Sequence, residues 1–110
     1  MRLLLLLVLL VTQSFAQDKS GISVVQFSAA FVESNEINLK QLKDCSSETL
    51  HMGKHAEVFK NENIKYLPTL ILYHNGDEII RVESGISLKL PEEAVITIQD
   101  EIDKILESKF

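Results

Sequence analysis

The chain has 110 residues, of which 45% are hydrophobic, and its formal net charge is −5 at pH 7. This length allows one small domain, and an acidic chain without a basic cluster repels nucleic acid and anionic membranes. We therefore expect neither as a partner.

Residues 1–16 have the parts of a cleavable export signal. Arg2 supplies a positive start, Leu3 to Val11 is an unbroken apolar run, and Ser14 to Gln17 contains small residues at the cleavage position. Those nine apolar residues would span about 13 Å as a helix, whereas a bilayer core is about 30 Å thick. We predict a signal peptide rather than a membrane anchor.

Cleavage would leave a mature domain of residues 17–110. Arg2 is the one charged residue of the removed part, so the mature chain would have 10 basic and 16 acidic side chains, a net charge of −6. The Ser14–Gln17 ending resembles those of proteins exported by Gram-negative bacteria. We therefore expect a secreted, periplasmic protein that is not bound to the membrane after cleavage.

The first two predicted elements of the mature chain differ in the spacing of their apolar residues. Residues 22–27 are apolar and β-branched with few polar positions, which favours a central strand that is buried on both faces. In residues 31–44, Leu39 and Leu42 are spaced to face inward while the polar residues beside them face outward. The pattern predicts a helix over residues 31–44.

The middle of the chain predicts a short strand at residues 49–52, a helix at 54–61, and two strands at 69–74 and 78–83. Asn75-Gly76 between the last two strands accepts positive φ at both positions, as a type I′ hairpin turn requires. These two strands are therefore predicted to pair in antiparallel orientation.

The segment that begins at Pro91 has the clearest helical pattern. Pro91 suits the first helical position, and Glu92 and Glu93 favour the positive end of a helix. Apolar residues then recur at steps of three and four: Val95, Ile98, Ile102, Ile105 and Leu106. The predicted order is βαβαββα, an α/β fold with a mixed four-stranded sheet flanked by helices.

Four short segments carry a resemblance to a known family: Val24 to Ala29, Ile64 to Thr69, Asn75 to Glu78, and Gly85. In this order and spacing they resemble thioredoxin-like proteins. The resemblance covers residues 22–106 and implies a thioredoxin-like fold.

The resemblance also implies a site. It implies that Pro68 is a cis-proline in a loop that receives a substrate peptide and faces a Cys-x-x-Cys pair. The positions that match this pair are Val32 to Asn35, and none of them is a thiol. Dithiol exchange needs an attacking thiolate and a second sulfur, so this route is absent at that position.

Cys45 is the chain's single cysteine. It follows Asp44 near the C-terminal end of the helix predicted at residues 31–44. A helix C-terminus and an adjacent carboxylate both disfavour a thiolate. We interpret Cys45 as a structural thiol, with a reactive monothiol and a disulfide-linked homodimer as the open alternatives.

Neither a cofactor nor a metal site is predicted. His51 and His55 are four residues apart, but the first falls in a predicted strand, and a third ligand is missing at a suitable spacing. Glu33 and Glu36 are candidates for an acid–base pair near the Pro68 loop, with helix-start electrostatics as the simpler alternative.

The sequence therefore favours a redox-inactive binding or accessory module. An extended peptide can pair with exposed backbone without any sulfur chemistry, and we expect this at the Pro68 loop. The expected contact residues are Phe31, Val32, Tyr66, Leu67 and Pro68. The alternative function is a thiol-disulfide oxidoreductase, serving redox homeostasis, that uses Cys45 as a single thiol.

Overall fold

The computed structural model describes residues 21–108, so the predicted signal peptide lies outside the described part of the chain. Four strands and two α-helices follow one another, with three short 3-10 helices between them: β1 (Ile22–Ser28), η1 (Ala30–Asn35), η2 (Leu39–Gln41), β2 (Ser46–His51), α2 (Ala56–Asn61), β3 (Thr69–His74), β4 (Asp77–Glu83), η3 (Gly85–Ser87) and α3 (Ala94–Ser108). No helix within residues 21–108 is long and apolar enough to cross a membrane.

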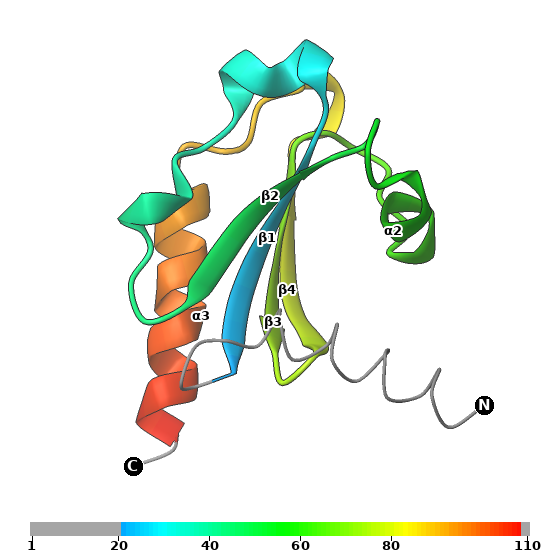
Figure 1. The fold of residues 1–110 in the computed structure, drawn as a ribbon. Helices are drawn as coiled ribbons and strands as arrows, with labels where there is room; N and C mark the ends of the chain where they lie inside the picture. Colours follow the sequence, from blue (N-terminus) through cyan, green and yellow to red (C-terminus); the bar gives the residue numbers. More distant parts are fainter. Residues whose placement is uncertain (1–20, 109–110) are drawn as a thin grey trace, which may run out of the picture.

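The strands form one mixed sheet in the order β2-β1-β3-β4 (Figure 1). β1 pairs in parallel with β2 and antiparallel with β3, and β3 pairs antiparallel with β4. The apolar run of β1 is buried along nearly its whole length, as expected for a central strand. The predicted mixed four-stranded sheet is confirmed.

The β3–β4 turn has the backbone that its sequence predicts. Asn75 and Gly76 have φ values of 54° and 88°, which are those of a type I′ turn. The Asn75 N–H donates to the Gly21 carbonyl at 2.9 Å, so the turn is fastened to the start of β1. A register shift between Leu72 and Tyr73 leaves Ile79 of β4 without an opposite residue, and its side chain is exposed.

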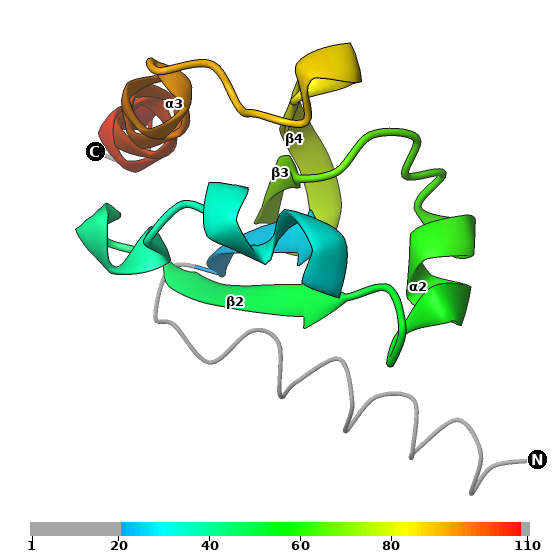
Figure 2. The same ribbon diagram turned by 90° about the horizontal axis from the view of Figure 1, so that it is seen from above.

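The two faces of the sheet are covered by different helices. In Figure 2, which looks along the sheet, α3 and α2 lie on opposite sides. The α3 face buries side chains of β1, β3 and α3: Ile22, Val24, Leu70, Leu72, Ala94, Ile98 and Ile102. On the α2 face, Phe59 packs edge-to-face on Phe27 with ring centroids 5.1 Å apart.

α2 has six residues, of which only Phe59 is buried, and two side chains of the sheet hold it in place. The Arg81 guanidinium donates to the carbonyls of Glu62 at 2.9 Å and Asn63 at 3.2 Å, just beyond the helix end. The Tyr73 hydroxyl donates to the Glu62 carboxylate. These bonds fix the position of the segment that leads from α2 to Pro68.

The long helix predicted for residues 31–44 is wrong. The chain forms η1 and η2 instead, with extended backbone between them. The buried Gln26 amide donates to the Ile37 carbonyl at 3.0 Å and accepts from the Ile37 N–H at 2.8 Å. Those two backbone groups are therefore unavailable to an α-helix, and Asn38 starts η2 by accepting from the Lys40 N–H.

Three predicted boundaries also shift. β2 begins at Ser46 rather than 49, and α2 begins at Ala56 rather than 54. Pro91 was expected at the first position of the last helix, but α3 begins at Ala94. The Pro91 carbonyl accepts from the Ala94 N–H at 3.0 Å, so the proline opens a turn that leads into the helix.

Candidate functional site

The connections gather at one end of the sheet. Because β1, β2 and β4 end there and β3 begins there, residues 29–45, 52–55, 62–68 and 84–93 all start or finish at this end, which is at the top of Figure 1. We call it the loop end. It carries all five residues that the sequence predicted for peptide contact.

The centre of the loop end is the approach to β3. The peptide bond between Leu67 and Pro68 is cis, and both side chains are buried. The Thr69 hydroxyl donates to the Tyr66 carbonyl at 2.6 Å and closes the bend. The backbone N–H and C=O of Leu67 make no hydrogen bond to another residue within 21–108. One backbone donor and one backbone acceptor beside Pro68 are therefore unpaired within the described residues.

The five predicted contact residues divide into two groups. Phe31 on η1 is 67% exposed, and Tyr66 is also exposed, so both side chains are accessible. Val32 is only 1% exposed and belongs with Leu67 to the core under α2, and Pro68 is likewise buried. These three residues can offer shape or backbone to a partner, but not their side chains.

Three further apolar residues are exposed at the loop end and were not predicted: Met52, Ile86 and Leu88. Together with Phe31 and Tyr66 they make up five of the seven large exposed hydrophobic residues within 21–108. Ile86 on η3 is 96% exposed. The Asn35 side-chain amide donates to the Leu88 carbonyl at 2.9 Å, which joins η1 to the segment after η3. Apolar side chains are thus exposed on η1, on η3 and in the segment just after η3.

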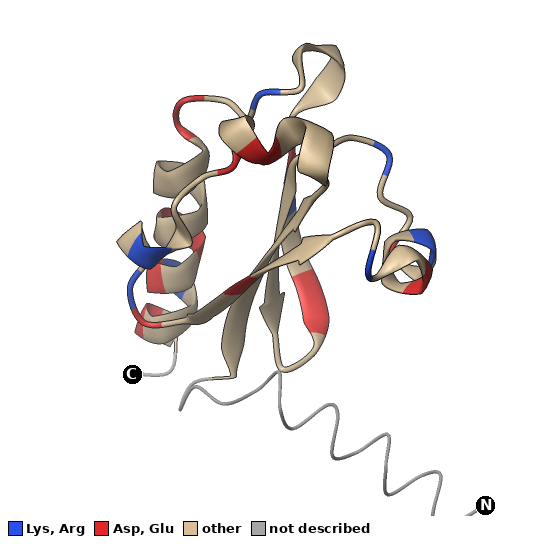
Figure 3. Cartoon of the chain, turned by 45° about the horizontal axis from the view of Figure 1, so that its top comes forward, with Lys and Arg blue, Asp and Glu red and all other residues tan. Residues whose placement is uncertain are grey.

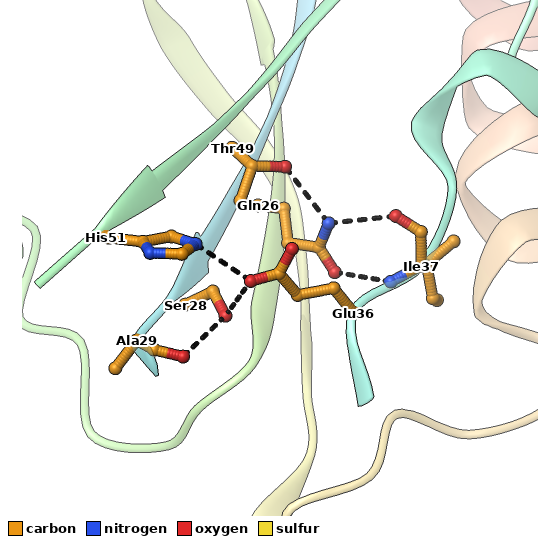
Figure 4. Close-up of polar contacts among 7 residues, drawn as sticks. All are labelled: Gln26, Ser28, Ala29, Glu36, Ile37, Thr49 and His51. Atoms are coloured by element: carbon orange, nitrogen blue, oxygen red, sulfur yellow. Dashed lines mark hydrogen bonds and ion pairs between the residues drawn. The ribbon is translucent and has the colours of Figure 1, made fainter. Parts of the chain in front are cut away.

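A polar cluster lies beneath η1 (Figure 4). One oxygen of the Glu36 carboxylate accepts from the Ser28 hydroxyl at 2.7 Å and contacts His51 Nε2 at 2.9 Å. Ser28 ends β1 and is fully buried, and His51 ends β2. Glu36 therefore ties the segment after η1 to the ends of two strands.

This cluster lacks the order that nucleophilic catalysis needs. A serine nucleophile must give its proton to a histidine, which a carboxylate orients from the other side. Here Ser28 donates to Glu36 rather than to His51, and its hydroxyl is buried. Glu33 lies apart on the exposed side of η1. The arrangement serves packing and positioning.

Cys45 lies far from the loop end. It immediately precedes β2, at the opposite end of that strand, and packs half-buried against the α3-side core. Because residues 31–44 do not form one helix, the expected effect of a helix C-terminus on its thiol has no structural basis. Within residues 21–108, no three His, Cys, Asp or Glu residues are grouped to hold a metal ion.

Charges of both signs surround the loop end. Figure 3 shows basic and acidic positions together on α2, and both signs in the loops that lead to α3. Lys54, Lys60 and Lys65 are accompanied by Glu57 and Glu62, and Glu92 and Glu93 are preceded by Lys89. Among the described residues, the loop end therefore has no side that carries a single sign of charge.

Comparisons with known proteins agree on the architecture. No protein-family model matches the chain, and no curated protein matches its sequence. Solved structures do match. A Schistosoma mansoni thioredoxin is 21% identical at a TM-score of 0.63, covering 86% of this chain and 85% of that one. A thioredoxin from Nicotiana alata is 23% identical at 0.57, covering 90% and 82%.

A Halobacterium salinarum thioredoxin mutant is 16% identical at a TM-score of 0.61, covering 82% of this chain and 79% of that one. At these identities the likeness concerns the fold alone. Residues 32–35 contain no thiol, and the chain's one cysteine lies elsewhere. The protein has a thioredoxin-like fold without the Cys-x-x-Cys pair.

Proposed function

We propose that the protein is a non-catalytic binding module that takes an extended peptide segment of another exported protein at its loop end. The observation that carries the proposal is the unpaired backbone of Leu67 next to an exposed apolar surface. We place this activity in the periplasm, on the strength of the predicted signal peptide.

The Leu67 backbone offers the polar half of such a site. An extended peptide that adds to a strand edge gains main-chain hydrogen bonds, and these do not depend on its sequence. Leu67 presents one N–H and one C=O immediately before β3, and the buried Pro68 and Thr69 hold them in place. A peptide laid across Leu67 can therefore pair with both groups.

The exposed apolar residues offer the other half. Phe31 lies on one side of the loop end in η1, and Tyr66 lies in the loop before Pro68. Side chains of an extended peptide alternate in direction, so one set can contact such residues while the backbone pairs with Leu67. Burying one large apolar side chain contributes about 1.5–3 kcal/mol.

The redox alternative rests on Cys45 alone. A catalytic thiol must reach the substrate disulfide, but Cys45 precedes β2 and is half-buried at the end of that strand opposite the loop end. A peptide bound at Leu67 would not reach it. We therefore expect Cys45→Ser to leave peptide binding unchanged.

A library of random linear 12-residue peptides displayed on phage provides a probe without a known partner. The mature chain, residues 17–110, is immobilised, and the enriched peptides are synthesised. We expect Phe31→Ser to weaken the tightest peptide by roughly 10- to 100-fold in titration calorimetry, because an apolar contact is lost. Ile79→Ser is the matched control, since Ile79 is exposed on β4 away from the loop end.

NMR titration with the same peptide locates the site. We expect chemical-shift changes at the backbone amides of Leu67 and Tyr66. The affinities of Ile79→Ser and Cys45→Ser for the peptide should equal that of the natural chain. Failure to enrich any peptide contradicts the proposal. Shifts confined to residues outside the loop end, or equal affinity of Phe31→Ser and the natural chain, also contradict it.

A further inference from the structure

The break between η1 and η2 leaves a hollow beside the loop end. The hollow has a volume of about 580 Å³ and lies between residues 35–41 and the segment from Lys89 to Ile96. This volume is in the range of pockets that hold small ligands or a few side chains. Its apolar lining comes from Ile37, Leu90, Pro91, Val95 and Ile96. Nothing in the proposed contact at Leu67 accounts for it.

The apolar lining is accessible on the α3 side. Ile96, in the first turn of α3, is 63% exposed, although the rest of the helix follows the usual rule of burying its apolar stripe. With Ile96 included, six of the seven large exposed hydrophobic residues within 21–108 lie at the loop end or in this hollow.

Two amide side chains on the rim have free hydrogen-bonding groups. Asn38 uses its side-chain oxygen to accept from Lys40, and Gln41 uses its amide nitrogen to donate to the Asn38 carbonyl. The Asn38 amide nitrogen and the Gln41 side-chain oxygen have no partner among the residues that the structure describes. The rim thus presents one donor and one acceptor, which is what a peptide backbone pairs with.

The hollow is continuous with the loop-end surface. Asn35 lines the hollow and also donates to the Leu88 carbonyl, and Leu88 is exposed next to Lys89 on the rim. The hollow therefore adjoins the loop end at Asn35 and at the Leu88–Lys89 segment.

We propose that the hollow takes the continuation of the same extended partner segment, with an apolar side chain against Ile96 and its backbone on Asn38 and Gln41. The inference rests on the proposed function and extends it. The partner segment is longer than the stretch that pairs at Leu67, and it carries a second apolar residue that the hollow selects.

The test uses the enriched 12-residue peptide and a series of versions shortened by one residue from each end. Ile96→Ser should weaken the full peptide by roughly tenfold or more, because an apolar contact is lost. It should not change the affinity of the shortest peptide that still binds. Ile79→Ser again serves as the control, since both isoleucines are exposed and neither belongs to the buried core.

The outcomes separate the two proposals. If Phe31→Ser weakens the full peptide and Ile96→Ser does not, the hollow is not part of the site, and the proposed function stands. If Ile96→Ser weakens the full and the shortened peptides equally, the extended footprint is wrong. If the peptide changes the amide chemical shifts of Gln41 and Ile96 but none near Leu67, the proposed function fails. The hollow is then an independent peptide site.

Discussion

Gln26 is the residue that determines how the chain leaves β1. Its side chain is fully buried in the central strand, where a polar group is costly unless it is hydrogen-bonded. Its amide exchanges two hydrogen bonds with the Ile37 backbone and donates a third to the Thr49 hydroxyl at 3.2 Å. This one side chain thus occupies the Ile37 N–H and C=O, which an α-helix would otherwise use (Figure 4).

Replacing Gln26 by methionine should therefore destabilise the protein although the volume is nearly kept. Gln26→Met leaves the Ile37 N–H and C=O without their partner, and each such loss costs about 1–3 kcal/mol. Urea unfolding would measure the decrease in the free energy of unfolding. Gln41→Met, which changes the same residue type at an exposed position, should alter it by less than about 0.5 kcal/mol. Equal stability of the two variants would show that the Ile37 contact is unimportant.

At the scale of elements, α2 depends on the sheet for its position. A six-residue helix has little stability of its own, and α2 buries only Phe59. Arg81 binds the carbonyls that follow its C-terminus, and Tyr73 binds Glu62. Since residues 62–68 lead directly to Pro68, these bonds also set the geometry of the proposed peptide site.

The Tyr73 contact makes stability sensitive to alkaline pH. Burial, followed by the hydrogen bond and the negative charge of Glu62, raises the pKa of Tyr73 well above its ordinary value of 10.0. Above pH 10 the unfolded chain loses this proton while the folded chain keeps it. The contribution is therefore complete below pH 10 and is lost as the pH rises beyond it, by at most about 1.4 kcal/mol per unit and less for a partly exposed ring.

Tyr73→Phe tests this assignment. The variant should be less stable than the natural chain at pH 8, because the hydrogen bond to Glu62 is lost, and the difference should shrink between pH 10 and 11. Denaturant unfolding at several pH values measures both. Tyr66→Phe is the matched control, because it removes a hydroxyl from an exposed tyrosine. A difference that stays constant above pH 10 would contradict the raised pKa.

For the whole molecule, the sheet could be predicted from sequence because its signals are local. The apolar run of β1 and the Asn75-Gly76 turn act within a few residues, and both appear where expected. The helix at residues 31–44 could not be predicted correctly. Its pattern was helical, but Gln26, eleven residues before Ile37, overrides it through a tertiary contact.

The candidate site was predicted in part for a similar reason. The resemblance to thioredoxin-like proteins identified Phe31 and Tyr66, which are exposed at the loop end. It could not distinguish these two residues from Val32, which is buried. Ile86 and Leu88 follow Gly85 in a segment without a repeating pattern, so their exposure depends on how η3 leaves the sheet. The hollow depends on the extended backbone between η1 and η2, and the helical pattern of residues 31–44 gives no sign of this interruption.

The short, interrupted η1 has a consequence for whether dithiol chemistry can be introduced by point substitution. A reactive thiol needs access to its target and a field that stabilises the thiolate, which a long helix N-terminus supplies. Val32 is 1% exposed, and η1 ends at Asn35. A cysteine placed at position 32 would be sheltered, and Asn35→Cys would remove the bond to Leu88.

We therefore expect the double variant Val32→Cys, Asn35→Cys to show little disulfide-reductase activity against a protein disulfide, even when it is folded by circular dichroism. Robust turnover would show that the local backbone is no obstacle. Without such turnover, two substitutions do not install dithiol chemistry, because the Gln26–Ile37 hydrogen bonds set the backbone on which the pair would sit. The obstacle then lies in the main chain, and a redesign would have to start at Gln26 in the strand rather than with two added sulfurs.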